Sequence, residues 1–341
     1  MKVLIIKMSS LGDVLHTLPA LTDAGNAIDD IEFHWVVEKA FEALPHWHPR
    51  VTKVIPLAFR TLRKTPVRSL MGTTWRRFVK TLRAEKYDLV IDAQGLIKSA
   101  LITRIARGTK AGLDKGSLRE PLARFAYQKH YAVDPTLHAV TRVRQLFAGA
   151  LNYAMPETPA DYGLHREAFK NKSTIQTDFV LFLHGTTWSS KCWPENYWIA
   201  LADLVKREGL DVYLSWGNKE EKARAQRIAD ASQAQVLPRM RLENIVNLVA
   251  AAKAIVSVDT GLGHIAAALS VPTVSLYGPT DANRTGMMGE NQVHLAADFP
   301  CSPCFQRECN YAKPSAEKPA CYTTVKPDAV LKALRSLNDT H

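Results

Sequence analysis

Short apolar runs alternate with polar, glycine-containing turns along much of the chain. Near the start, a β-branched run at residues 3–6 leads directly into the turn Ser-Ser-Leu-Gly-Asp, and a helix-like stretch follows at residues 14–24. A strand, a glycine turn and a helix in this order are how doubly wound α/β domains begin. Two further strands are expected in this half, at residues 33–37 and 89–91. The segment 147–153 is expected to close it.

The second half repeats this alternation after a polar, weakly periodic stretch at residues 155–177, which is typical of a linker. Each strand predicted beyond it ends in a small or glycine-containing polar turn. These four strands are expected at residues 179–183, 212–215, 254–258 and 273–276. In open parallel sheets the loops beyond the carboxyl ends of the strands build the ligand site. The pattern therefore predicts an α/β fold of doubly wound parallel sheets with a binding site at these turns.

The length of the chain indicates how many domains to expect. A chain of 341 residues exceeds one comfortable hydrophobic core, so two domains and a cleft between them are expected. The apolar run between Lys2 and Lys7 is shorter than a signal-peptide core. The uncharged stretch at residues 265–280 contains two prolines and several hydroxyl side chains, so it is not expected to span a membrane. We expect a cytoplasmic protein, peripheral on a membrane.

Charge favours an anionic partner. The formal net charge is +11, and residues 50–83 hold ten basic side chains and no acidic one. Nucleic acid, an acidic membrane surface or a phosphorylated substrate would each suit this bias. Only Phe59, Trp75 and Phe78 interleave the basic side chains, which leaves few stacking platforms for single-stranded nucleic acid. The segment therefore favours a phosphate-rich partner, and no nucleic acid is expected.

The turn Asp259-Thr260-Gly261-Leu262-Gly263-His264 joins a predicted buried strand to an alanine-rich helix. Unpaired amides at a helix start form a phosphate site, although a tight turn capped by Asp259 and Thr260 would show the same sequence. His264 is either a ligand contact or a turn histidine with internal partners. The glycine spacing differs from the G-x-G-x-x-G fingerprint, which argues against a nicotinamide-dependent dehydrogenase.

Two further turns hold side chains suited to group transfer. Asp13, after the first strand, could accept a proton from an attacking hydroxyl, or it could simply complement the start of a helix. Lys191 could place an ammonium on a pyrophosphate, with Thr186 and Thr187 donating hydroxyl hydrogen bonds. A solvated surface lysine is the alternative.

Four cysteines near the carboxyl terminus have the spacing C-x2-C-x4-C-x11-C. They are Cys301, Cys304, Cys309 and Cys321. In a cytosolic chain this spacing favours a structural metal over disulfides. Because a second C-x-x-C knuckle is missing, free or redox-active thiols are the alternative.

Several long blocks of the chain carry a resemblance to a known family. They are MKVLIIKMSSLGDVLHTLPALTDA, HWVVEKAF, DAQGLIKSA, REPLARFAY, HAVTRVRQLF, LHGTTWSSKCWPENYW, SVDTGLGHIAAALSVPTVSLYGPT and CSPCFQREC. Together they resemble the lipopolysaccharide heptosyltransferases of glycosyltransferase family 9, most closely the heptosyltransferase I type. The resemblance implies an inverting enzyme of the GT-B fold, with two Rossmann-like domains facing a cleft.

The resemblance also implies how the chain is divided. Residues 1–160 would bind the acceptor, 161–178 would be a linker, and 179–320 would bind ADP-heptose. Residues 321–341 would form a last helix that packs back on the first domain.

Roles for individual residues follow from the same resemblance. Asp13 matches the general base, and Lys191 matches a stabiliser of the leaving diphosphate. Other positions match donor contacts, namely Thr186, Thr187, Glu221, Met240, Asp259, Thr260, Gly261 and His264. The acceptor's negative charge would meet Arg60, Arg63, Lys64, Arg119 and Arg142. No metal or other cofactor is required for such a transfer.

The implied reaction moves L-glycero-D-manno-heptose from ADP-heptose to the Kdo of Kdo-lipid A, as the first heptose of the lipopolysaccharide inner core. The enzyme would then work on the cytoplasmic face of the inner membrane, attached peripherally to its anionic surface. Another GT-B transferase of core assembly is the alternative within the fold. A non-enzymatic basic protein that binds nucleic acid or anionic membrane is the alternative outside it.

Overall fold

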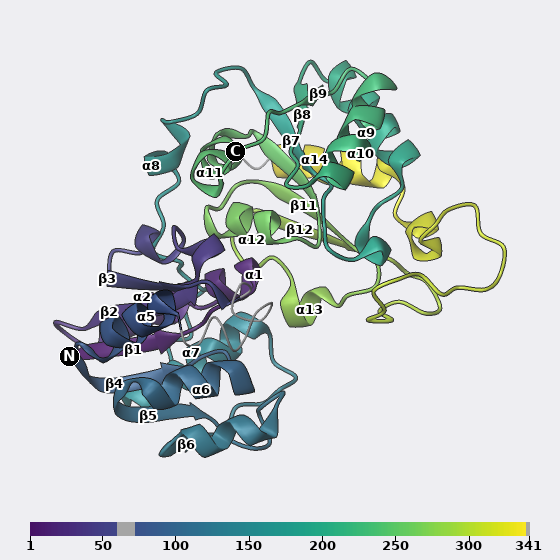
Figure 1. The fold of residues 1–341 in the computed structure, drawn as a ribbon. Coiled ribbons are helices and arrows are strands. Elements are labelled where there is room, and N and C mark those ends of the chain that lie inside the picture. Colours follow the sequence, from purple (N-terminus) through teal and green to yellow (C-terminus); the bar gives the residue numbers. More distant parts are fainter. Residues whose placement is uncertain (60–71, 339–341) are drawn as a thin grey trace. The chain divides into compact units, whose positions relative to one another are not determined.

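The chain folds into two compact units, Met1–Leu164 and His165–His341. The computed structural model describes residues 1–59 and 72–338 (Figure 1). The stretch expected as a linker, residues 161–178, largely belongs to the second unit. Arg166 donates hydrogen bonds to the carbonyl oxygens of Ala250 and Ala252, at 2.8 and 2.9 Å, which attaches this stretch to the second unit.

The first unit is a parallel sheet with helices on both faces. Its strands are β1 (Lys2–Ile6), β2 (Glu32–Glu38), β3 (Val51–Leu57), β4 (Lys86–Asp92), β5 (Arg107–Leu113) and β6 (Lys129–Tyr131), in the order β3-β2-β1-β4-β5-β6. Its helices are α1 (Leu11–Leu15), α2 (Leu18–Ala27), η1 (Lys39–Phe41), η2 (Pro45–Trp47), α5 (Thr73–Arg83), α6 (Ile97–Ile105), η3 (Pro121–Ala126) and α7 (Ala139–Leu151). Helices α5 and α6 pack on the face that holds Leu4 and Ile6, while α2 and α7 lie side by side.

The second unit repeats the same plan. Its strands are β7 (Phe179–Leu183), β8 (Asp211–Leu214), β9 (Gln235–Val236), β10 (Ala254–Val258), β11 (Thr273–Tyr277) and β12 (Gln292–Ala296), in the order β12-β11-β10-β7-β8-β9. Its helices are α8 (Glu167–Lys170), η4 (Ser189–Lys191), α9 (Glu195–Arg207), α10 (Lys219–Asp230), α11 (Leu242–Ala251), α12 (Gly261–Ala268), α13 (Ala282–Thr285), η5 (Ala320–Thr324) and α14 (Pro327–Asn338). The two strand orders are equivalent when each unit is counted from its own first strand.

The predicted strands form because their apolar runs are buried on both faces. All five residues of β7, β10 and β11 are buried, and continuous apolar runs of this kind are typical of parallel strands covered by helices. The segment 147–153, expected to close the first half, forms the end of α7, which Asn152 caps in the left-handed conformation.

The last helix packs on the core of its own unit. In α14, Val330, Leu331, Leu334 and Leu337 join the core of the second unit. These positions recur at helical spacing, so they form one apolar stripe, which contacts α9 and β11. The expected packing of α14 on the first domain stays a prediction. Among the described residues, no helix combines the length and apolar character needed to cross a bilayer.

Candidate functional site

In each unit the strand order reverses between two central strands, β1 and β4 in the first and β7 and β10 in the second. Ligands of open parallel sheets bind beyond the carboxyl ends of the strands at such a reversal. The candidate site residues are therefore those in the turns after these strands, two turns in each unit.

Asp13 lies in the turn of the first unit, on the short helix α1. Its Oδ2 accepts hydrogen bonds from the Ser10 backbone N–H at 2.7 Å and from the Ser10 hydroxyl at 2.9 Å. The side chain is nevertheless 43% exposed, so one carboxylate oxygen can face a ligand. The helix-start role and a base role are compatible in this geometry.

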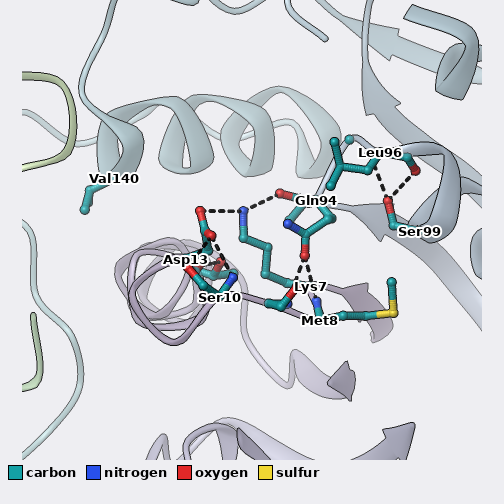
Figure 2. A network of polar contacts seen from close by, with 12 residues as sticks. Lys7, Met8, Ser10, Asp13, Gln94, Leu96, Ser99 and Val140 are labelled. Atoms are coloured by element: carbon teal, nitrogen blue, oxygen red, sulfur yellow. Dashed lines mark hydrogen bonds and ion pairs between the residues drawn. The ribbon is translucent and has the colours of Figure 1, made fainter. Parts of the chain in front are cut away.

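Lys7 lies at the end of β1 beside Asp13 (Figure 2). It is only 6% exposed, and its Nζ donates to the Ala93 carbonyl oxygen at 2.8 Å and lies 3.9 Å from Asp13 Oδ1. Burial lowers the pKa of Lys7, while the charges of Asp13 and Asp92 oppose that shift. A buried ammonium thus points at the exposed carboxylate.

The loop after β4 holds the loop after β1 in place. Gln94 Oε1 accepts hydrogen bonds from the backbone N–H groups of Met8 and Ser9, each at 3.0 Å (Figure 2). Asp92, fully buried, accepts from the Gln94 and Gly95 backbone N–H groups and from the Tyr127 hydroxyl, the last at 2.7 Å. Burial raises the pKa of Asp92.

The predicted acceptor-side cations fall into two groups. Arg142, on α7, donates to the Ser117 carbonyl oxygen at 3.0 Å and is close enough to Lys7 to lower its pKa further. Arg119 is exposed just before η3. The remaining three predicted cations lie outside the described residues, namely Arg60, Arg63 and Lys64.

In the second unit, three predicted residues meet at Asp259, directly after β10. Lys191 Nζ lies 2.7 Å from Asp259 Oδ2, and His264 Nε2 lies 3.9 Å from Asp259 Oδ1. Thr186 donates its hydroxyl hydrogen bond to the Asp259 carbonyl oxygen at 3.2 Å. The Asp259 carboxylate also accepts from the Thr280 hydroxyl at 2.7 Å.

Helix α12 begins at this cluster. Thr260 is its N-cap residue, in extended conformation and without a side-chain capping bond, and Gly261 is its first residue. The first amides of the helix therefore lack a capping side chain, as an anion site at a helix start requires.

Lys191 is held in position by neighbours that the sequence did not indicate. Its Nζ lies 4.5 Å from the centre of the Trp188 ring, and its carbonyl oxygen accepts a hydrogen bond from the Tyr322 hydroxyl at 3.0 Å. The adjacent Ser190 donates its hydroxyl hydrogen bond to the Gln306 carbonyl oxygen at 2.6 Å. The cysteine-bearing segment thus supports the turn that carries Lys191.

Three other predicted donor residues lie near this turn or beyond it. Glu221, at the start of α10, accepts from the Gly217 backbone N–H at 2.7 Å, and a Cβ atom on Gly185 would come 2.6 Å from its carboxyl carbon. Gly185 is therefore required for this close approach. Thr187 is exposed in the β7 turn, and Met240 is half-buried before α11. Their donor-binding roles stay predictions.

The four cysteines that were candidates for a metal site line one cavity of about 260 Å³ in the second unit. All are free thiols, and burial raises the pKa of Cys321 to about 12, with the three other thiols adding to the shift. Within the described residues, no group of three or more histidine, cysteine, aspartate or glutamate side chains is arranged to hold a metal ion. The arrangement fits free thiols, and the structural metal stays a prediction.

The family of the chain follows from comparison with known proteins. The family model "Glycosyltransferase family 9 (heptosyltransferase)" matches residues 75–314. The chain belongs to glycosyltransferase family 9. Within family 9, it is 49% identical to "Lipopolysaccharide heptosyltransferase 1" of Pseudomonas aeruginosa, over 99% of this chain and 98% of that protein. The Escherichia coli K12 protein of the same name is 46% identical over 86% of this chain and 92% of its own length.

Two solved heptosyltransferase structures share the fold along the chain. "E. coli heptosyltransferase WaaC with ADP" is 40% identical, with a TM-score of 0.87 over 99% of this chain and 100% of that one. The same enzyme "with ADP-2-deoxy-2-fluoro heptose" has a TM-score of 0.84 over 98% and 99%. The prediction of a GT-B fold is thereby confirmed, and this family 9 chain is a glycosyltransferase.

Three residues of the candidate site were not predicted from the sequence. Lys7, Gln94 and Thr280 each contact a predicted site residue or its turn. The signal for Lys7 was a charge at the end of an apolar strand, two positions before the turn begins at Ser9. Gln94 and Thr280 lie in the turns that follow predicted strands, so the strand-end rule that selected Asp259 could have selected them as well.

Proposed function

We propose that the chain transfers L-glycero-D-manno-heptose from ADP-heptose to the Kdo of Kdo-lipid A, adding the first heptose of the lipopolysaccharide inner core. One observation carries this proposal, the 49% identity over nearly the whole chain to a lipopolysaccharide heptosyltransferase 1. The likeness to a WaaC structure that holds an ADP-heptose analogue supports the same donor.

The donor side is the cluster around Asp259. When ADP-heptose binds, the Lys191 ammonium and the first amides of α12 face the diphosphate and stabilise the negative charge that develops on it as the bond to heptose breaks. Trp188 and Tyr322 hold Lys191 at the place where that charge forms. Thr186, Thr187 and His264 complete the donor contacts, with Glu221 and Met240 toward the nucleoside.

The acceptor side is the cluster around Asp13. Its carboxylate takes the proton of the Kdo hydroxyl as that oxygen attacks the anomeric carbon, and ADP leaves from the opposite face, so the configuration inverts. Arg60, Arg63, Lys64, Arg119 and Arg142 provide positive charge for the phosphorylated acceptor. Because the acceptor is a lipid, the enzyme works attached to the cytoplasmic face of the inner membrane.

A transfer assay with product stereochemistry tests the proposal. Purified protein is incubated with Kdo-lipid A and either ADP-heptose or a UDP-sugar, and the new glycosidic bond is assigned by NMR. Transfer from ADP-heptose with inversion is expected. Transfer only from a UDP-sugar would identify a different GT-B enzyme, and transfer from no donor would refute the proposal.

The variant Asp13→Asn tests the base. Asparagine can still accept the Ser10 hydrogen bonds but cannot take a proton, so kcat should fall by about 10²–10⁴-fold while donor affinity is retained. Asp29→Asn, which removes one negative charge at an exposed position of the same unit, is the matched control and should behave as wild type. Equal activity of the two variants would remove Asp13 from the mechanism.

A further inference from the structure

Exposed apolar side chains gather on two elements of the first unit. Among the described large hydrophobic side chains that are exposed, four lie on α6 and η3: Ile97 (43%), Leu101 (59%), Leu122 (66%) and Phe125 (65%). The others, Met1 and Phe305, lie apart from them in the sequence. Isolated exposed apolar side chains are ordinary, but four on two neighbouring elements indicate an interaction surface.

The two elements are joined side by side. Helices α6 and η3 contact each other, and Ala100, Leu118, Ala123 and Tyr127 form a small core between them. The Ile97 backbone N–H also donates to Glu120 Oε2 at 2.7 Å, which connects the start of α6 to the start of η3. The exposed side chains therefore belong to one supported surface.

The spacing on each element places its apolar pair on one side. Ile97 and Leu101 are four residues apart on an α-helix, so they are neighbours along one side of α6. Leu122 and Phe125 are three residues apart on a 3₁₀ helix, where such positions eclipse each other. Buried Ala100 and Ala123 lie next to these pairs in the chain and attach both elements to the core.

The segment that carries this apolar surface is rich in positive charge. Residues 97–133 hold eight basic side chains, namely Lys98, Arg104, Arg107, Lys110, Lys115, Arg119, Arg124 and Lys129, and only two acidic ones. Both acidic side chains already accept hydrogen bonds from their own unit, Asp114 from Ser117 and Glu120 from Ile97. The Arg124 guanidinium lies 4.7 Å from the centre of the Phe125 ring, so cation and aromatic ring are directly adjacent.

We propose that this α6–η3 face, defined by Ile97, Leu101, Leu122 and Phe125 with the basic side chains of the same segment, docks on an anionic lipid bilayer. Leucine and phenylalanine side chains enter the boundary between headgroups and acyl chains, and lysine and arginine bind the phosphates above them. A protein partner fits less well, because protein interfaces are depleted in lysine while this segment holds four.

The proposal deepens the proposed function, since a transferase acting on a lipid needs a surface that meets the bilayer. It names the face responsible, and this can be tested without any transfer reaction. Binding to vesicles and transfer of heptose are separate measurements, so either can fail alone.

Vesicle sedimentation is the direct test. Full-length wild type is compared with Leu122→Ser/Phe125→Ser on vesicles of phosphatidylethanolamine and phosphatidylglycerol and on vesicles of phosphatidylcholine alone. Wild type is expected to bind the anionic vesicles, less in 0.5 M salt, and the double variant to bind at least tenfold more weakly. Phe305→Ser, an exposed phenylalanine of the second unit, is the matched control and should bind as wild type.

Two further measurements separate the possible outcomes. With a water-soluble Kdo acceptor that lacks acyl chains, the double variant should keep wild-type turnover, while its KM for Kdo-lipid A in vesicles rises. Arg124→Glu should also weaken vesicle binding severalfold. Vesicle binding unchanged in both variants would overturn the proposal. So would a wild-type dimer in analytical ultracentrifugation that the double variant loses, since the face would then serve a second copy of the chain.

Discussion

Lys7 shows what a single buried charge does beside the candidate base. Taking an ammonium out of water is unfavourable unless partners replace the lost hydration, and the described partners of Lys7 are the Ala93 carbonyl and the Asp13 carboxylate. Ser10 fixes one oxygen of that carboxylate and Lys7 attracts the other. Asp13 is thus held from two directions.

The variant Lys7→Met tests whether this contact positions Asp13. Methionine keeps an unbranched apolar stem but removes the charge, so we expect kcat to fall by about 10–100-fold with donor KM little changed. Lys2→Met, at the other end of β1, is the matched control and should retain activity.

The pH profile distinguishes positioning from loss of structure. Because the folded pKa of Lys7 is lowered from 10.5, its charge is lost as pH rises through a value below 10.5, and wild-type kcat should decline there. Lys7→Met should lack this alkaline decline. A variant that keeps the same decline would show that Lys7 does not act on the base.

At the scale of elements, the loop after β4 determines the conformation of the loop after β1. Gln94 accepts two backbone hydrogen bonds from the turn that leads to α1, and Asp92 fixes the Gln94 backbone in turn. Asp13 is therefore placed by a neighbouring strand as much as by its own helix.

The variant Gln94→Ala should loosen this arrangement. Two partly buried backbone N–H groups lose their acceptor, which costs about 1–3 kcal/mol of unfolding free energy, and we expect turnover to fall about tenfold. Gln128→Ala is the matched control, because Gln128 accepts one backbone hydrogen bond, from Lys110 at 2.6 Å, away from Asp13. Urea unfolding and steady-state kinetics measure both effects. A Gln94→Ala enzyme with wild-type turnover would contradict the coupling of the two loops.

The elements that the sequence did not predict differ physically from those it did. Strands β7, β10 and β11 are continuous apolar runs, whereas β5 begins with four exposed or partly exposed residues and β9 has only two residues. The edge strands β6 and β12 are likewise polar and partly exposed, so hydrophobic patterning is weak there.

The residues of the candidate site likewise fall into those that the sequence could predict and those that it could not. Asp13 lies at the first turn after buried β1, and the Asp259 turn directly follows buried β10, so local pattern was enough to select them. The contact of Gln94 with Met8 spans 86 positions and exists because β4 lies beside β1. The order of strands depends on how the whole sheet assembles. It cannot be predicted from the pattern of apolar and polar residues along the sequence.

For the whole molecule, each unit contains a buried histidine that must stay neutral. Burial lowers the pKa of His48 in the first unit to about 4 and that of His184 in the second to about 4. His48 Nδ1 accepts a hydrogen bond from the Arg50 backbone N–H at 3.2 Å, which a protonated ring could not do. Both units therefore share one sensitivity to acid.

Acid should destabilise the first unit through His48. In the unfolded chain His48 is protonated below its ordinary pKa of 6.5, whereas in the folded protein it is protonated only below about pH 4. The free energy of unfolding therefore decreases as pH falls from 6.5 to 4, by up to about 3 kcal/mol. His48→Asn should lose less on going from pH 7 to 4.5, measured by urea unfolding, whereas exposed His46→Asn should follow wild type. Parallel pH dependences of wild type and His48→Asn would disprove the linkage.

The ion pair between Lys191 and Asp259 has a consequence for which ligands the free enzyme retains. With a carboxylate 2.7 Å away, the ammonium is already neutralised, and Thr280 holds that carboxylate in place. An incoming anion gains little by merely replacing one negative charge with another. In the proposed donor site the pair would therefore select for charge: a diphosphate carries anionic oxygens on two phosphorus atoms, enough to contact the ammonium and the helix start together, whereas a neutral nucleoside carries none. Inhibitors that imitate only the sugar or the nucleobase would leave the ion pair intact and would lack the contact between a diphosphate and Lys191.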